Sequence, residues 1–447
     1  MRSISKKLSG SSKRSSNAVE FAALESRLMF CGYHAAAGGA ILTQTPGLHA
    51  PGNGSSGSDN HGGTRIVTGL NVPVYNSLPG AKATIYLDFD GDDARTWGSY
   101  SVPFTPAYDT DGHASGFSAQ ELANIAEIWQ RVAEKFSPFN INVTTVDPGN
   151  YANGKAMQVV IGGNGSWMSG GAGGVSYVNS FTNSSPNTAY AFTMNLGNGF
   201  PKYVAEAISH ESGHSFGLQH QSAYSGQTKT AEYSSGTSSS APTMGNSYGA
   251  ARGMWWTGTS SNGTSQDDLA VLSSSTNGFG YRGDDYGSAM SSAKNLKFKS
   301  GKFSIKGALT SVSDKDFFKF NFNGGSLTLK LRGQGAGSML DAKLRLYKSD
   351  GTMLNNIDGS GLSETIIRTL PAGTYYAAVF SHGGYGDIGQ YTLYGYDDVA
   401  GAPAPSTAPS PSTGGSTQGT NKVASIFSSE SIAKSLHAEL VAELLAA

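Results

Sequence analysis

The chain has 447 residues, with 31 Lys plus Arg against 32 Asp plus Glu, and only 14% of its residues are charged. This length predicts two or more domains joined by connecting segments. The formal net charge of -1 argues against nucleic acid or an acidic lipid surface as the main partner. The 60 glycines, 21 tyrosines and 20 phenylalanines predict a turn-rich chain with much antiparallel sheet.

Cysteine usage and hydropathy narrow the choice further. Cys31 is the only cysteine, so there is no disulfide framework and no thiolate metal cluster. Any metal site must therefore use His, Asp or Glu. No apolar run approaches the roughly 18 residues needed to span a bilayer, so we expect no transmembrane segment.

The first 30 residues carry a basic region followed by an apolar stretch over 18–30 that Glu20, Glu25 and Arg27 interrupt. This pattern is unlike a standard signal peptide. The run Leu24-Glu-Ser-Arg-Leu-Met29 resembles the short leader of many surface and secreted proteins of planctomycete bacteria. The resemblance implies export, and the alternative is an amphipathic N-terminal helix without a targeting role.

Order begins near residue 80 in this interpretation. Residues 35–79 are rich in Gly, Ser, Ala and Asn without an apolar period, and with the leader they form a predicted flexible pro-region or linker over 1–79. Residues 83–89 then read as a strand. The segment 118–136 predicts a helix, because Ser118 with Glu121 makes a capping box and apolar residues recur at helical spacing.

Alternating strands and a second helix complete the first predicted domain. Further strands are expected over 139–146, 157–161, 174–178 and 189–196. Pro201 then opens a helix through the residues that follow. The order predicts an α+β domain over 80–276, with a twisted mixed sheet and two long helices.

The second helix carries the run His210-Glu211-Ser-Gly-His214-Ser-Phe-Gly217-Leu-Gln-His220, which has the pattern HExxHxxGxxH. Histidines four residues apart project from one face of a helix, so both imidazoles can reach one metal ion. Glu211 lies about 100° further round, close to a metal-bound water without being a ligand. Gly217 can adopt the left-handed conformation that ends the helix and returns His220 to the metal.

This residue set predicts a catalytic zinc site rather than a closed structural one. Three neutral nitrogen donors leave a coordination position open for water. Zinc lowers the pKa of that water towards ~7, and Glu211 acts as general base and then passes the proton to the leaving amine. A chance HExxH in a helix is the alternative, and it does not account for the glycine at the one place that needs a turn.

The extended motif resembles that of the metzincin metallopeptidases. The segment Ala241-Pro-Thr-Met244-Gly-Asn-Ser-Tyr248 is similar to their Met-turn, which implies that Met244 underlies the metal without ligating it. Members with a tyrosine ligand carry it two residues after this methionine, where Asn246 stands here, so Tyr248 is not predicted as a ligand. The resemblance also implies an edge strand that binds extended substrate, for which residues 174–178 are our candidate.

From residue 303 to 394 the apolar residues alternate at period two between glycine-containing turns, which predicts an all-β antiparallel sandwich. The segments Asp284-Asp-Tyr-Gly287, Asp314-Lys-Asp-Phe-Phe318 and Leu370-Pro-Ala-Gly-Thr-Tyr-Tyr376 resemble the bacterial pre-peptidase C-terminal domain, here bounded at 277–400. That resemblance implies targeting, adhesion to substrate or help with secretion.

The remaining residues, 401–447, begin with a linker rich in Pro, Ser, Thr and Gly. The apolar residues Ile432, Leu436, Leu440 and Leu444 then recur every four positions, which predicts a short amphipathic helix. Simple packing or exposure to solvent is favoured for this helix, and attachment to a cell surface or matrix is the alternative.

Two acidic loops raise the question of a second metal. Asp88, Asp90 and Asp92, and likewise Asp109 and Asp111, alternate as carboxylates do in calcium loops, but neither loop continues into an EF-hand. Ordinary acidic turns are favoured, and structural Ca²⁺ stays open. The pair Trp255–Trp256 is expected to fill core.

The sequence therefore predicts a secreted bacterial zinc endopeptidase, located outside the cell or at its surface, that acts on protein or peptide substrates. The second hypothesis is an adhesive surface protein whose protease domain has lost activity and whose sandwich domain binds. The complete ligand set, with Glu211 still present, favours the active enzyme.

Overall fold

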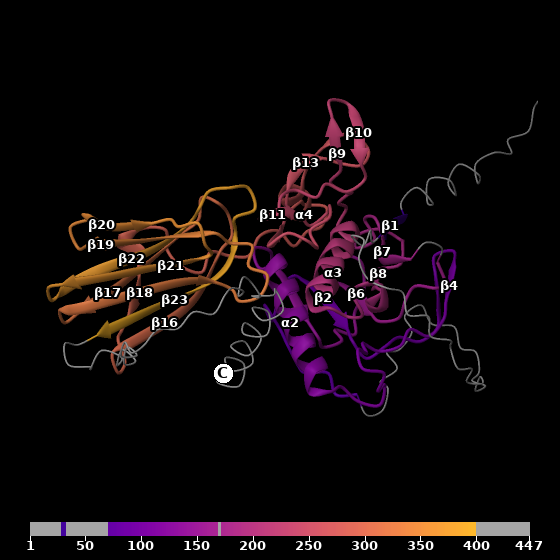
Figure 1. Ribbon diagram of the computed structural model, residues 1–447, viewed down its shortest axis with the longest axis horizontal. Helices are drawn as coiled ribbons and strands as arrows, with labels where there is room; N and C mark the ends of the chain where they lie inside the picture. Colours follow the sequence, from indigo (N-terminus) through magenta and orange to yellow (C-terminus); the bar gives the residue numbers. More distant parts are fainter. Residues whose placement is uncertain (1–27, 33–69, 169–170, 399–447) are drawn as a thin grey trace, which may run out of the picture.

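Figure 1 shows the computed structural model, which describes residues 28–32, 70–168 and 171–398. Its first part is built on a six-stranded sheet in the order β1-β7-β8-β6-β2-β5. The strands are β1 (Leu28–Gly32), β2 (Ala83–Asp88), β5 (Ile141–Thr144), β6 (Ala156–Ile161), β7 (Ala172–Tyr177) and β8 (Thr188–Ala191). Strands β5, β2, β6 and β8 run parallel, whereas β7 is antiparallel to both β8 and β1.

Two long helices, α2 (Ala119–Phe136) and α3 (Pro201–Ser215), lie against one face of this sheet (Figure 1). Ser118 caps α2 through the predicted capping box with Glu121, which satisfies backbone donors at the helix start. Fully buried Ile125 and Val132 of α2 join the same core cluster as Ile208 of α3. The predicted mixed sheet with two long helices is confirmed.

The other face of the sheet is covered by a hairpin of β3 (Arg95–Trp97) and β4 (Tyr100–Val102). Trp97 is completely buried there, and its ring lies 4.4 Å from that of Tyr177 and 5.5 Å from that of Tyr190. Aromatic burial thus seals this face, because rings of this size remove much apolar area from water.

Residues 70–79, which the sequence analysis assigned to the linker, pack against the sheet domain. The Tyr75 ring stacks on Trp129 at 4.9 Å between centroids, and Asn76 forms a bridge with Thr144. Residues 24–27 of the leader, the C-terminal linker and the predicted helix near 432–444 lie outside the described residues, whereas the last two leader residues, Leu28 and Met29, belong to β1.

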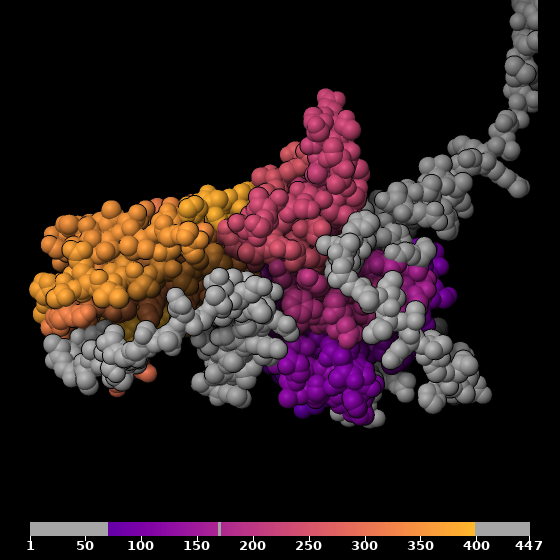
Figure 2. All heavy atoms as spheres, in the orientation of Figure 1, coloured from indigo at the N-terminus to yellow at the C-terminus, as the bar shows by residue number. Residues whose placement is uncertain are grey.

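Short elements follow α3. They are β9 (Ala223–Ser225), β10 (Thr228–Ala231), β11 (Ser240–Pro242), β12 (Arg252–Met254), β13 (Thr257–Thr259), β14 (Ser265–Asp267) and α4 (Asp268–Leu272). A short 3₁₀ turn, η1 (Thr193–Asn195), lies before α3. The β9–β10 hairpin stands out from the body in Figures 1 and 2. Trp255 fills core as expected, being fully buried in the main cluster, but Trp256 is only half-buried and belongs to none of the core clusters, so the prediction is wrong for it.

The second part is a β-sandwich with its own core. One sheet has the order β15-β17-β22-β19-β20 and the other β16-β23-β18-β21. The strands are β15 (Lys294–Leu296), β16 (Lys302–Leu309), β17 (Lys315–Phe322), β18 (Gly325–Gly333), β19 (Ala342–Lys348), β20 (Met353–Ile357), β21 (Ser363–Leu370), β22 (Gly373–Ser381) and β23 (Gly389–Asp398), with the turn η2 (Met290–Ser292) before them. All pairs are antiparallel except β15 with β17, so the predicted sandwich is confirmed.

The two parts are in direct contact. Glu134, completely buried on α2, accepts hydrogen bonds from the backbone N–H groups of Met339 and Gln390. Arg252 forms an ion pair of 2.6 Å with Asp387. These buried polar contacts attach the sandwich to the C-terminal end of α2 and to β12. Among the described residues, no helix is long and apolar enough to cross a membrane.

Candidate metal centre

Helix α3 holds the central motif in place. Pro201 occupies its first turn, where a missing N–H costs nothing and the fixed φ suits a helix. His210 and His214 are one turn apart on this helix and are only 4% and 0% exposed. The helix therefore points both imidazoles into the protein interior.

The structure brings the three predicted histidine ligands together. His210, His214 and His220 offer nitrogen atoms that all lie within 4.8 Å of one another. The Nε2 atoms of His210 and His214 are 3.1 Å apart, and the His220 ring lies 4.9 Å from that of His214. This spacing is what a shared ion requires of three imidazoles.

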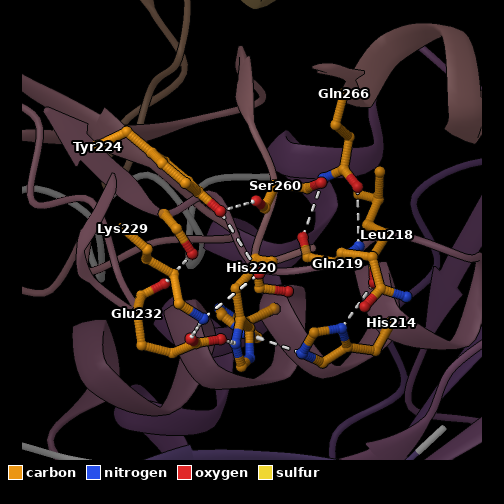
Figure 3. Close-up of polar contacts among 12 residues, drawn as sticks. His214, Leu218, Gln219, His220, Tyr224, Lys229, Glu232, Ser260 and Gln266 are labelled. Carbon is orange, nitrogen blue, oxygen red and sulfur yellow. Dashed lines mark hydrogen bonds and ion pairs between the residues drawn. The ribbon is translucent and has the colours of Figure 1, made fainter. Parts of the chain in front are cut away.

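Each histidine is oriented by a partner at its other ring nitrogen. The Nδ1–H of His210 donates to the Thr243 carbonyl at 2.8 Å, and that of His214 donates to the Leu218 carbonyl at 2.7 Å. For His220 the acceptor is a Glu232 carboxylate oxygen at 2.6 Å (Figure 3). Because these hydrogen bonds keep the proton on Nδ1, each imidazole has a free lone pair on Nε2 that can bind a metal.

Burial also keeps these imidazoles neutral. It lowers the pKa of His210 to about 4 and that of His220 to about 2, and it lowers the pKa of His214 well below its usual value. Neutral imidazole is the form that binds a metal. The donor set fits Zn²⁺: three buried neutral nitrogens from one helix and the loop after it.

Gly217 ends the helix as the sequence predicts. Its φ is +103°, and its N–H donates to the His214 carbonyl at 2.8 Å. A β-carbon at this position would overlap the Asn179 side-chain oxygen. Only glycine suits both constraints, and the reversal brings Leu218 and then His220 back to the helix (Figure 3).

Glu211 lies beside β7, which packs against α3, the helix that carries His210 and His214. Its side chain is completely buried. A β-carbon on Gly174 would lie 2.7 Å from the Glu211 Oε1 atom, so the glycine leaves space for this carboxylate. The prediction that residues 174–178 form an edge strand is wrong, because β7 pairs with β8 on one side and with β1 on the other. The role of Gly174 in admitting Glu211 was not predicted from the sequence.

Met244 is fully buried beneath the motif helix. A β-carbon on Gly213 would stand 2.5 Å from the Met244 sulfur, so the glycine inside the HExxH run admits the methionine. Tyr248 packs instead on Tyr203, with 5.5 Å between ring centroids. The resemblance to a Met-turn thus matches the position of Met244, and the prediction that Tyr248 is not a ligand stays a prediction.

Glu232 is the site residue that sequence reasoning missed altogether. It follows the β9–β10 hairpin, forms an ion pair with Lys229 and accepts a hydrogen bond from the Nδ1–H of His220 (Figure 3). A Glu twelve residues after a ligand histidine has no motif of its own. The only available signal was chemical: an acidic residue in the loop between the third histidine and the Met-turn.

The two acidic loops differ from each other. Asp109 and Asp111 lie within 4.8 Å of the buried carboxylate of Glu121, although that carboxylate also caps α2. Asp88 and Asp92 are buried on the outer face of the sheet, where burial raises the pKa of Asp88 well above its usual value and Arg95 pairs with Asp92. The prediction of structural calcium stays untested.

Comparison with known families gives a match that includes the motif helix. Residues 127–221 match the family model of the metallo-peptidase family M12B, reprolysin-like. The matched residues include His210, His214 and His220. This reprolysin-like region supports zinc metallopeptidase activity, and it confirms the resemblance to zinc metallopeptidases that the motif indicates.

The sandwich has a match of its own. Residues 314–381 match the bacterial pre-peptidase C-terminal domain, which confirms the second resemblance. No curated protein matches the chain. The reprolysin-like region is thus followed by a domain type that is typical of secreted bacterial proteases.

Solved structures cover only part of the chain. The pre-peptidase C-terminal domain of a collagenase from Bacillus anthracis is 16% identical with a TM-score of 0.20, covering 26% of this chain and 97% of that one. PliG from Aeromonas hydrophila, a periplasmic inhibitor of g-type lysozyme, is 15% identical with a TM-score of 0.18, covering 23% and 96%. The two assignments therefore rest on the family models and not on these structures.

Proposed function

We propose that this protein is a secreted zinc endopeptidase that cleaves peptide bonds inside protein substrates. The main support is the set of three buried, neutral histidines, each of which donates a hydrogen bond from Nδ1. Glu211 lies next to His210 on the same helix. His210, His214 and His220 would hold the ion. A zinc ion bound there supplies a Lewis acid that polarises the scissile carbonyl and activates water.

The chain's own groups supply the proton transfer. Glu211 accepts a proton from the attacking water and delivers it to the leaving amine, a role that is worth about 10²–10⁴-fold in rate. Its burial against Gly174 holds the carboxylate in one place and limits access of bulk water. A low local dielectric strengthens its interaction with the developing charges.

Strand β7 is proposed to bind the substrate backbone. It contains Gly174, next to Glu211, and its edge already pairs antiparallel with another extended segment, Leu28–Gly32. That pairing supports the view that this side of β7 accepts a chain in strand conformation, and Leu28–Gly32 has to leave it before a substrate strand can bind there. Main-chain hydrogen bonds would then give affinity, and side-chain pockets would give selectivity.

The proposed boundaries are 80–276 for the catalytic domain and 277–400 for the pre-peptidase-like domain. Two separate core clusters support a division into two domains, although Tyr75 packs against the first cluster and Phe279 belongs to it, just outside the proposed bounds. The pre-peptidase match supports an extracellular or cell-surface location, and attachment through the sandwich or the C-terminal segment is part of the proposal. A structural calcium ion at the acidic loops stays a prediction.

The rival function is an adhesive surface protein with an inactive protease domain. One experiment separates the two: zinc per chain and hydrolysis of an unstructured protein are measured for the full chain and for Glu211→Ala, with Glu127→Ala as a control on α2. The proposal predicts one zinc per chain in all three proteins and internal cleavage products from the wild type and the control. A metal-free wild type, or equal turnover by Glu211→Ala, would overturn it.

A further inference from the structure

A fully buried lysine lies at the C-terminal end of α2. Lys135 is only 1% exposed, and its ammonium is 3.1 Å from a carboxylate oxygen of Glu206. It also donates to the Gly253 carbonyl and, at 3.4 Å, to the Thr243 hydroxyl. Burying an ammonium is unfavourable unless polar partners replace the lost hydration. Lys135 therefore depends on these three contacts.

The partner carboxylate is on the metal-binding helix. Glu206 is 3% exposed and precedes His210 by four residues, so both side chains project from one face of α3. Its second carboxylate oxygen accepts a hydrogen bond of 2.6 Å from the Ser247 hydroxyl. The ion pair therefore links α2, α3 and the loop that contains Met244.

This ion pair contacts the Met244 loop on both sides of the methionine. Lys135 binds the hydroxyl of Thr243, and Glu206 binds the hydroxyl of Ser247. The carbonyl of the same Thr243 accepts the Nδ1–H of His210. Only Thr243 thus separates the buried ion pair from the proposed metal ligand His210.

The surrounding backbone is shaped to admit the pair. A β-carbon on Gly253 would overlap both the Glu206 carboxylate and the Lys135 ammonium. Contacts between α2 and α3 do not need the charges, because apolar residues such as Val132 and Ile208 already pack in the same core. A buried ion pair also contributes little net stability compared with apolar side chains of similar size.

We propose that Lys135 and Glu206 are positioning residues of the metal centre. Together they fix the Thr243–Ser247 loop, and through the Thr243 carbonyl they set the ring orientation of His210. The inference rests on the proposed function only in requiring that the three histidines bind a metal. It does not depend on which substrate is cleaved.

The test measures metal binding and unfolding separately in the full chain. The double variant Lys135→Met/Glu206→Leu removes both charges and keeps apolar volume. We expect its zinc affinity, measured by chelator competition, to fall about 10–100-fold, as for other groups that orient ligands. The visible absorption of the Co²⁺-substituted protein should shift, while the urea midpoint of the metal-free form stays close to that of the wild type.

Two further variants keep the test decisive. Ser247→Ala releases one link to the loop without creating a buried lone charge, so a smaller loss of zinc affinity and a Co²⁺ spectral shift are expected even if the double variant does not fold. Arg95→Met breaks an ion pair with Asp92 on the opposite face of the sheet and should lower the urea midpoint without changing zinc affinity.

Wild-type zinc affinity and an unchanged Co²⁺ spectrum in Ser247→Ala, and in the double variant where it folds, would overturn the proposal. So would an equal loss of zinc affinity in Arg95→Met, since the effect would then follow general stability. A wild type that binds zinc but cleaves no protein would refute the proposed function alone, because none of these readouts uses turnover.

Discussion

Gly174 of β7 lies directly against Glu211 of α3: a β-carbon on the glycine would stand 2.7 Å from both Cγ and Oε1 of the glutamate. It would also stand 2.8 Å from the Tyr190 carbonyl oxygen, so the glycine cannot avoid the glutamate by shifting towards β8. Strand β7 and the proposed base therefore pack closely because residue 174 has no side chain.

Gly174→Ala is expected to displace the Glu211 carboxylate and to lower kcat by about 10²-fold, because general-base catalysis depends on a well-placed carboxylate. Zinc content should stay at the wild-type level, since the three atoms nearest to the new methyl group belong to Glu211 and Tyr190 and not to a histidine. Gly116→Ala is the control, because a β-carbon there meets nothing within 4 Å. Wild-type kcat in Gly174→Ala would show that this contact does not constrain the base.

Glu232 should strengthen zinc binding through His220. Glu232→Ala removes the carboxylate that accepts the His220 Nδ1 proton, so we expect zinc affinity to fall by about 10–100-fold. Lys229→Met removes only the partner of Glu232 and should change zinc affinity much less. Chelator competition measures both variants. Equal zinc affinity in wild type and Glu232→Ala would contradict an orienting role.

Gly217→Ala should damage both stability and metal binding. The positive φ and the overlap with Asn179 predict a loss of about 1–3 kcal/mol in the free energy of unfolding. Gly112→Ala separates the two causes, because Gly112 also has a positive φ of +83° but a β-carbon there meets nothing within 4 Å. Urea unfolding and zinc titration are the measurements, and only Gly217→Ala should lose zinc affinity.

Asp316 of the sandwich makes stability depend on pH. Burial raises its pKa to about 8, with smaller contributions from Asp285 and Asp314, while a hydrogen bond from the Tyr391 hydroxyl opposes the rise. The native state thus binds a proton that the unfolded chain releases near pH 3.8. Stability should therefore fall as pH rises from about 4 to about 8.

Asp316→Asn tests this pH dependence, because the amide oxygen can still accept from Tyr391 but carries no charge. Thermal unfolding in buffers free of divalent cations should show the variant gaining on the wild type as pH increases across that window. The gap in Tm should be smallest near pH 4, where both side chains are neutral in the native state. Parallel Tm curves for the two proteins would contradict the raised pKa.

Local patterns in the sequence were sufficient for the two long helices, for several main strands and for the proposed ligand set. The capping box at Ser118 and Glu121 and the helical spacing after it depend on contacts between residues a few positions apart. The period-two run near Phe318 reflects the alternation of successive side chains between the two faces of one strand. The HExxH spacing likewise depends on one helical turn, and Gly217 marks where that helix ends.

Partners from distant segments were decided only by the tertiary structure. Thr243 reaches His210 across 33 positions, and Lys135 reaches Gly253 across 118. Gly174 meets Glu211 because β7 lies beside α3, which no spacing in the chain indicates. The sequence by itself determined which side chains can bind a metal, since ligand chemistry and helical period are local. Only packing decided which backbone and carboxylate groups orient them, because those contacts exist once remote segments are brought together.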